Sequence, residues 1–96
     1  MTLEEIAEIV TARAKGRIRG SVRLEMPDLG TLYVDKTGAE ISEAEADLTL
    51  TAKSRVFHDI ATGTQNAATA FMTRKLKVDG NPMRALKIGE ILSSEG

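Results

Sequence analysis

The sequence predicts an α+β protein, and three patterns along the chain indicate it. Apolar residues recur with helical spacing over residues 3–15, and then with the period of two that is typical of strands over residues 20–52. Residues 54–92 return to helical spacing, interrupted by one further short strand. A run of strands between helices is typical of a sheet covered by helices, because an apolar helix face must pack against another apolar surface.

Length and composition favour one small folded domain, residues 1–96. The chain has 96 residues, of which 42% are apolar, and its 13 basic and 14 acidic residues nearly cancel. It has no cysteine, which excludes disulfides and zinc–thiolate sites. No apolar run approaches the roughly 20 residues of a membrane span, and the N-terminal residues show no signal-peptide pattern. We therefore expect a cytoplasmic protein.

The first helix is expected over residues 3–15. Thr2 and Glu5 have the spacing of a capping box, in which each side chain accepts a hydrogen bond from the other residue's backbone N–H. Gly16 suits the end of the helix. The apolar face consists of Leu3, Ile6, Ala7, Val10 and Ala14.

Four strands are expected between residues 20 and 52. Turns at residues 27–30 and 36–38 separate the first three, and residues 39–42 form the third. Short turns of this kind join neighbouring antiparallel strands, so we expect an antiparallel meander with one face exposed to water. The apolar positions that alternate with polar ones are Val22, Leu24, Met26, Leu32, Val34, Ala46, Leu48, Leu50 and Ala52.

Two short helices are expected after the fourth strand. Ser54 is expected to cap the first of them, which Gly63 ends, and either Thr64 or Asn66 caps the second. Both helices must cover the sheet with their apolar residues, which are Val56, Phe57, Ile60, Ala61, Ala67, Ala68, Ala70, Phe71 and Met72.

A short strand and a final helix follow. In the strand, residues 75–78, Leu76 and Val78 alternate with lysines, and an Asp-Gly turn then ends it. Asn81 is expected to cap a helix over residues 82–92. The side of this helix that should face the sheet carries Ala85, Leu86, Ile88, Gly89 and Leu92.

Met83 and Ile91 fall on the opposite, polar side of that helix. Isolated apolar residues are common on any protein surface, and this explanation is sufficient for both of them. The alternative is that they contact a second subunit, a membrane surface or the mouth of a pocket.

Charge is segregated along the chain, whose net charge is −1. Residues 13–23 hold five basic residues and no acid, whereas residues 28–47 hold six acids and one lysine. Complementation of helix ends and solvated strand faces explains this pattern. The alternative is a docking patch for an anionic lipid head group, a phosphate or an acidic partner. A nucleic-acid partner is not expected, because it needs a strongly basic face.

The residues offer little for catalysis. His58 is the single histidine, and its neighbour Asp59 points elsewhere because adjacent helical positions do not share a face. A general-base role for His58 is kept only as a third hypothesis. No HxxxH pattern or carboxylate cluster indicates a metal, and no glycine-rich phosphate loop is present. We therefore expect a protein that is not an enzyme and holds no metal or cofactor.

The stretch FMTRKLKVDGN, residues 71–81, joins a helix end, a strand, a tight turn and a helix start. In this order of elements it resembles the C-terminal part of the sterol carrier protein type-2 family, as a short, prokaryote-like member would. Residues 46–50 also resemble one of the family's strands. The likeness is carried by Gly63, Ala70, Phe71, Met72, Lys75, Leu76, Lys77, Val78, Gly80, Asn81, Ala85 and Leu86.

The resemblance implies an α+β fold with a mostly antiparallel five-stranded sheet and helices packed on one face. It also implies a tunnel between sheet and helices for sterols, fatty acids or acyl chains. Members of the family also occur as accessory or dimerising domains attached to enzymes. An empty cavity of about 300 Å³ would cost about 7 kcal/mol, which is similar to the whole stability of a small domain. Hence a lipid fills the tunnel, the tunnel is small, or a second subunit closes it.

Two functional hypotheses follow. The first is non-enzymatic binding of a fatty acid, acyl-CoA or sterol-like ligand in an apolar pocket, with at most peripheral membrane contact. The second is an interaction or homodimerisation module with a filled core and no ligand. The residues predicted to line the pocket are Phe57, Ile60, Phe71, Met72, Leu76, Met83 and Leu86.

Overall fold

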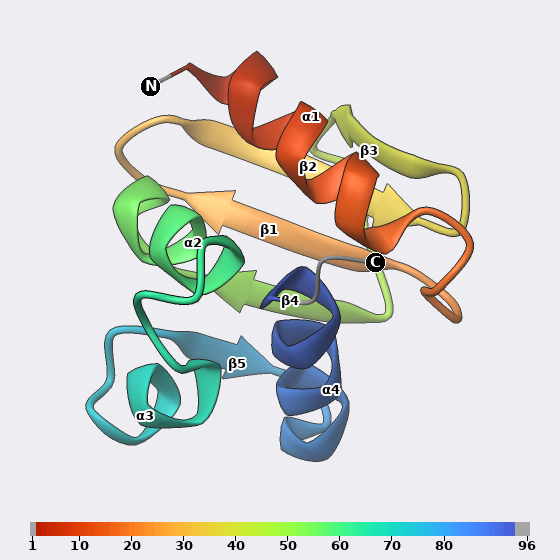
Figure 1. The fold of residues 1–96 in the computed structure, drawn as a ribbon. Coiled ribbons are helices and arrows are strands. Elements are labelled where there is room, and N and C mark those ends of the chain that lie inside the picture. The colour runs from red at the N-terminus through yellow and green to blue at the C-terminus, as the bar shows by residue number, and fades with distance from the viewer. Residues whose placement is uncertain (1, 94–96) are drawn as a thin grey trace.

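In residues 2–93, which the computed structural model describes, five strands form one sheet and four helices cover one of its faces (Figure 1). The predicted α+β class, with helices on one face of a five-stranded sheet, is confirmed. The strands are β1 (Val22–Met26), β2 (Gly30–Asp35), β3 (Gly38–Ile41), β4 (Leu48–Thr51) and β5 (Lys77–Asp79). The helices are α1 (Leu3–Ala14), α2 (Ser54–Ala61), α3 (Ala67–Met72) and α4 (Pro82–Ser93).

The strands lie in the order β3-β2-β1-β4-β5. Three of the four pairings are antiparallel, which confirms a mostly antiparallel sheet. The expected meander holds for β1 to β3 but is wrong for β4, which pairs in parallel with β1. Ser21 and Asp47 position β4: the Ser21 N–H donates to the Asp47 carboxylate at 3.2 Å, and the Asp47 N–H donates to the Ser21 hydroxyl at 3.0 Å. The two strands therefore begin side by side.

The core lies between the sheet and the helices. Alternation along the strands points every second side chain at the helices, as the sequence predicted. α1 lies over β2 and β3, whereas α3 and α4 lie over the part of the sheet that contains β5 (Figure 1). The strand side chains buried in this core are Val22, Leu24, Met26, Leu32, Val34, Leu48 and Leu50. Helix side chains that meet them include Ile6, Val10, Ala14, Phe57, Ile60, Ala85, Ile88 and Leu92.

Local caps agree with the sequence at three helices. Thr2 and Glu5 form the expected capping box on α1. Asn66, rather than Thr64, caps α3 by accepting a hydrogen bond from a backbone N–H, and Asn81 does the same for α4. These caps could be predicted because the two partners are neighbours in sequence.

The expected cap at Ser54 is wrong. Ser54 is the first residue of α2, and its N–H and hydroxyl both donate to the carboxylate of Asp28, at 2.9 and 2.6 Å. The start of α2 is thereby tied to the β1–β2 turn. These two hydrogen bonds lower the pKa of the Asp28 carboxyl below its ordinary value because they favour its charged form, and the bond from the hydroxyl has the larger effect.

β5 begins at Lys77, two residues later than predicted. The N–H groups of Lys75 and Leu76 both donate to the carbonyl of Ala70, at 2.8 and 3.0 Å, and so complete the end of α3 instead of the sheet. Arg74 makes this reversal with a φ of +66°, a left-handed conformation that strains an L-residue. The Leu76 side chain nevertheless lies in the core, as expected.

α4 extends one residue beyond its predicted end. Four of the five residues expected on its inner side are buried, and Leu86 is half-buried at the margin of the core. Met83 is 74% exposed, as expected of the polar side. Ile91 differs from that expectation, because it is half-buried and packs against the core.

Candidate ligand-binding groove

A surface groove of about 370 Å³ lies where the start of α3 and the preceding loop face α4. Ala67, Ala68 and Gly89 contribute small surfaces to it, and Leu86 contributes the largest apolar side chain. Its volume is at the lower end of the range that small-molecule sites occupy. The full lining is Gly63, Gln65, Asn66, Ala67, Ala68, Leu86, Gly89, Glu90 and Ser93.

Gly89 sets the distance between the two helices that form the groove. A Cβ atom at this position would lie 2.3 Å from the Cβ of Ala67, so α3 can approach α4 only because residue 89 has no side chain. Glycine inside a helix costs about 1 kcal/mol relative to alanine. Its presence here indicates that close packing of α3 on α4 matters more than the stability of α4 alone.

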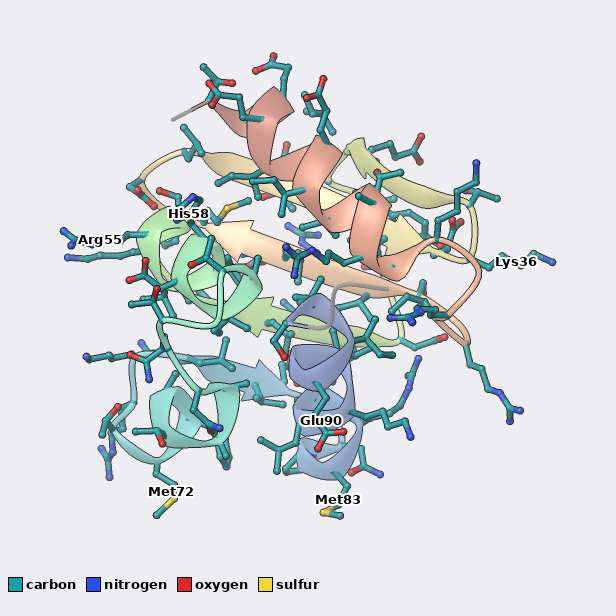
Figure 2. The ribbon with its side chains drawn as sticks, viewed as in Figure 1. Lys36, Arg55, His58, Met72, Met83 and Glu90 are labelled. Carbon is teal, nitrogen blue, oxygen red and sulfur yellow. The ribbon has the colours of Figure 1, made fainter. Side chains whose placement is uncertain are left out.

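Polar groups at the rim of the groove are mostly bound within the chain. Asn66 caps α3, the side-chain amide of Gln65 donates to the Asn66 carbonyl at 3.1 Å, and the Ser93 hydroxyl donates to the Glu90 carbonyl at 3.0 Å. The one titratable side chain of the lining is Glu90, which is exposed and lies on α4 (Figure 2). The groove therefore offers small apolar walls and one negative charge.

The seven residues predicted to line a pocket are dispersed in three environments. Phe57, Ile60 and Leu76 are at most 2% exposed and belong to the core. Phe71 and Leu86 are half-buried, and of the seven only Leu86 lines this groove. Met72 and Met83 are exposed and point away from the protein at the ends of α3 and α4 (Figure 2). A ligand-lining role for these residues stays a prediction.

Sequence reasoning missed the small residues of the groove. Ala67 and Ala68 were expected to cover the sheet, and Gly89 was placed on the inner side of α4 without a partner. A glycine inside a helix does indicate a close approach, but nothing local to Gly89 names Ala67 as the residue it meets.

α3 is the most weakly anchored of the described helices. It has six residues, of which only Ala70 is buried. A helix this short is not stable by itself, so packing against neighbours must hold it in place. Segments with few buried apolar contacts open at lower free energy than the core does. Of the described helices, α3 is therefore the one expected to open at the lowest free energy.

Other chemistry is sparse in the described part of the chain. Within residues 2–93 no three His, Asp or Glu side chains gather as a metal site would require. The His58 ring lies 3.7 Å from the carboxylate of Asp59, measured from Nδ1 to Oδ1, and both lie outside the groove. None of the described helices is long and apolar enough to cross a membrane.

Spaces between helices are among the places where proteins bind small molecules. The SCP-2 sterol transfer family matches residues 4–93, and the chain belongs to that family. The resemblance seen in the sequence is confirmed.

Individual relatives agree with this assignment. A fatty acid-binding protein of Yarrowia lipolytica is 40% identical over 57 residues, which are 59% of this chain and 44% of that protein. The chain thus aligns with less than half of that relative. The apo structure of sterol carrier protein 2 from the same organism is similar with a TM-score of 0.63 and 27% identity, over 93% of this chain and 74% of that one. Sterol carrier protein 2 of Aedes aegypti, in complex with palmitate, shares the fold with a TM-score of 0.77 and 19% identity, over 97% of both chains.

Proposed function

We propose that this protein binds a lipid or acyl-chain ligand, such as a fatty acid, an acyl-CoA or a sterol-like molecule, without catalysing a reaction on it. Membership of the SCP-2 sterol transfer family over residues 4–93 is the observation that carries the proposal. The fatty acid-binding relative, at 40% identity, supports an acyl chain as the ligand class. The groove between α3 and α4, on the helix-covered side of the sheet, supports an entrance there.

In this proposal the acyl chain enters between α3 and α4 and displaces α3 outward. Its tail then reaches the half-buried side chain of Phe71 and the core side chains of Phe57, Ile60 and Leu76 behind it. Met72 and Met83 lie at the ends of the two helices, outside the lining of the groove, and are exposed to an approaching ligand. The apolar ligand replaces the contacts that α3 loses, so the structure keeps no dry cavity of the size that would cost several kcal/mol.

Glu90 is expected to repel the carboxylate of a fatty acid that binds in the groove. Two carboxylates at close range repel each other, and the repulsion grows as water is excluded. Glu90→Gln is therefore expected to tighten binding of palmitate and to leave binding of its uncharged methyl ester unchanged. Equal effects on both ligands would show that Glu90 does not repel the head group.

Filling the groove tests the proposal directly. Ala68→Phe places a large ring in the groove. It is therefore expected to weaken binding of a fluorescent fatty acid by about ten-fold or more. Ala12→Phe, on the exposed side of α1, adds the same ring elsewhere and serves as the matched control. Mass spectrometry of an organic extract of the purified protein checks for a ligand that is already bound. No lipid in the extract and no uptake of the fluorescent fatty acid would contradict the proposal.

The second candidate function is an interaction or homodimerisation module with a filled core. The closely packed core side chains of Phe57, Ile60 and Leu76 favour it, and Met83 offers an exposed apolar contact. Light scattering on the wild type and on Met83→Glu separates the two cases. A dimer that Met83→Glu dissociates supports the module, whereas a monomer in both samples excludes this surface.

The proposal also treats residues 1–96 as one sterol carrier protein-like domain that acts in the cytoplasm and needs no cofactor, as expected from the sequence. Limited proteolysis tests the domain, because a single domain is cut only near its ends. Fractionation of cells that express the tagged protein measures the location.

A further inference from the structure

Two of the three large apolar side chains that are exposed in residues 2–93 project from the same edge of the molecule, one from α3 and one from α4 (Figure 2). Met72 ends α3 and is 80% exposed, and Met83 lies in the first turn of α4. Figure 2 shows both side chains pointing in the same direction, away from the sheet. The third, Ile41 on β3, belongs to the opposite edge of the sheet. This edge therefore exposes two separate apolar side chains.

The segment that contains both methionines has an excess of positive charge, although the exposed acid Glu90 also lies near Met83 on α4 (Figure 2). Residues 72–87 contain five basic residues and one acid, although the whole chain has a net charge of −1. We name residues 72–87 the methionine edge. Four of its cations, Arg74, Lys75, Lys77 and Lys87, are exposed, so they can approach a partner without rearrangement of the fold.

The positive charge continues on both flanks of the methionine edge. On one flank, Arg84 and Lys87 share a hollow of about 320 Å³ with Arg17 and Arg19. The Arg84 side chain donates to the Arg19 carbonyl and so holds the basic loop against α4. Part of the basic run at residues 13–23 therefore joins this surface, although it lies far away in sequence.

On the other flank, Arg74 and Lys75 share a larger hollow with Lys53 and Arg55, where Asp59 is the one acid of the lining. The cations of the methionine edge and of the two hollows thus come from four segments of the chain. A spread of flexible cations suits many anions in a plane better than it suits one ligand of fixed shape.

We propose that the methionine edge docks on an anionic lipid bilayer, with Met72 and Met83 entering the interface and the surrounding lysines and arginines contacting the head groups. Apolar insertion and electrostatic attraction are the two contributions that peripheral binding of this kind requires. An acidic protein would satisfy the cations but offers no reason for two flexible apolar side chains that point the same way. The docking does not depend on whether the groove binds an acyl chain.

Vesicle sedimentation with the full chain tests the docking. The protein is expected to bind vesicles of equal parts phosphatidylcholine and phosphatidylglycerol, to bind phosphatidylcholine vesicles much more weakly, and to be released by about 0.5 M NaCl, since salt screens exposed charges. Equal binding to both vesicle types, or binding that salt does not change, would overturn the proposal.

Matched variants test the named residues. Met72→Ser with Met83→Ser is expected to lower the partition onto anionic vesicles by about ten-fold, whereas Ile41→Ser, at the other edge of the sheet, leaves it unchanged. Lys75→Glu and Lys87→Glu are each expected to lower it by at least about five-fold. Lys36→Glu, which alters the same charge far from this edge (Figure 2), leaves it unchanged. All of these side chains are exposed, so the variants keep the fold, and a thermal melt verifies it.

Other outcomes have a definite meaning. Wild-type partition of the methionine variant would overturn the proposal. A dimer in light scattering that the same variant dissociates, without vesicle binding, would assign the edge to a second copy of the chain and also overturn it. Fatty-acid binding, measured without vesicles, tests the proposed function and not the docking. Vesicle binding without fatty-acid binding would keep the docking and refute only the proposed function.

Discussion

The helices that cover the two ends of the sheet differ in how much of each is buried in the core. At the β3 end, α1 has twelve residues and inserts Ile6, Val10 and Ala14 into the core. At the β5 end, α3 has six residues with only Ala70 buried, and β5 itself has three residues, of which only Val78 is half-buried. The first end provides stability, whereas the second holds the groove and the methionine edge. Stability and the proposed ligand access therefore fall to different parts of the same sheet.

The largest expected effect compares one leucine from each end. Leu32 on β2 is fully buried under α1, so Leu32→Ala should lower the free energy of unfolding by about 2–5 kcal/mol. Leu86 is half-buried at the groove, and Leu86→Ala should cost less than about 1.5 kcal/mol. Urea unfolding of both variants measures the difference. Similar losses in the two variants would show that the β5 end is anchored as firmly as the β3 end.

A smaller effect is expected where α3 meets α4. Gly89→Ala would bring two Cβ atoms to 2.3 Å and should cost about 1–3 kcal/mol, because α3 must move. In an Ala67→Gly background the same change should cost nothing, or stabilise by up to about 1 kcal/mol through helix propensity. Urea unfolding of the double-mutant cycle measures this coupling. An equal cost of Gly89→Ala in both backgrounds would show that this contact does not hold α3.

The strained turn after α3 provides a third test. Arg74 has a φ of +66°, which glycine adopts without strain, so Arg74→Gly should stabilise the protein by about 0.5–1 kcal/mol. Thermal unfolding measures the gain. Lys75→Gly, one residue later with a φ that is not positive, is the control and should not stabilise. If Arg74→Gly lowers the melting temperature, the arginine side chain holds α3 by contacts that outweigh the strain.

The smallest effect is expected at the exposed carboxylate that ties α2 to the β1–β2 turn. Hydrogen bonds from Ser54 lower the pKa of Asp28 in the folded state, so their contribution is present above its ordinary value of 3.8 and is lost as the pH falls below it. Asp28→Asn should lower the melting temperature at neutral pH and flatten its decline between about pH 5 and pH 3. Asp35→Asn removes the second carboxyl with a lowered pKa, bonded to Thr37. An unchanged pH profile in Asp28→Asn would contradict the role of the Ser54 bonds.

Features that depend on neighbouring residues could be predicted from the sequence. The alternation at Val22, Leu24 and Met26 predicted the buried face of β1, and the Thr2–Glu5 spacing predicted the start of α1. In each case the partners are a few residues apart, so a short pattern contains the whole interaction.

Features that join distant segments could not be predicted in this way. The parallel pairing of β4 with β1 depends on Ser21 and Asp47, which lie 26 residues apart. The start of α2 depends on Asp28, and the groove depends on Ala67 facing Gly89. Nothing in the residues beside these positions specifies the partner, because the fold alone brings the two together.

Amide hydrogen exchange with and without palmitate is the most direct test of ligand binding between α3 and α4. Without ligand, amides of α3 should exchange faster than those of α1, because α3 opens at lower free energy. Saturating palmitate should slow exchange in Ala67–Met72 and Pro82–Ser93 and leave α1, β2 and β3 unchanged. Slower exchange confined to α1 and the β3 end, or no change at saturation, would contradict acyl-chain binding at this groove.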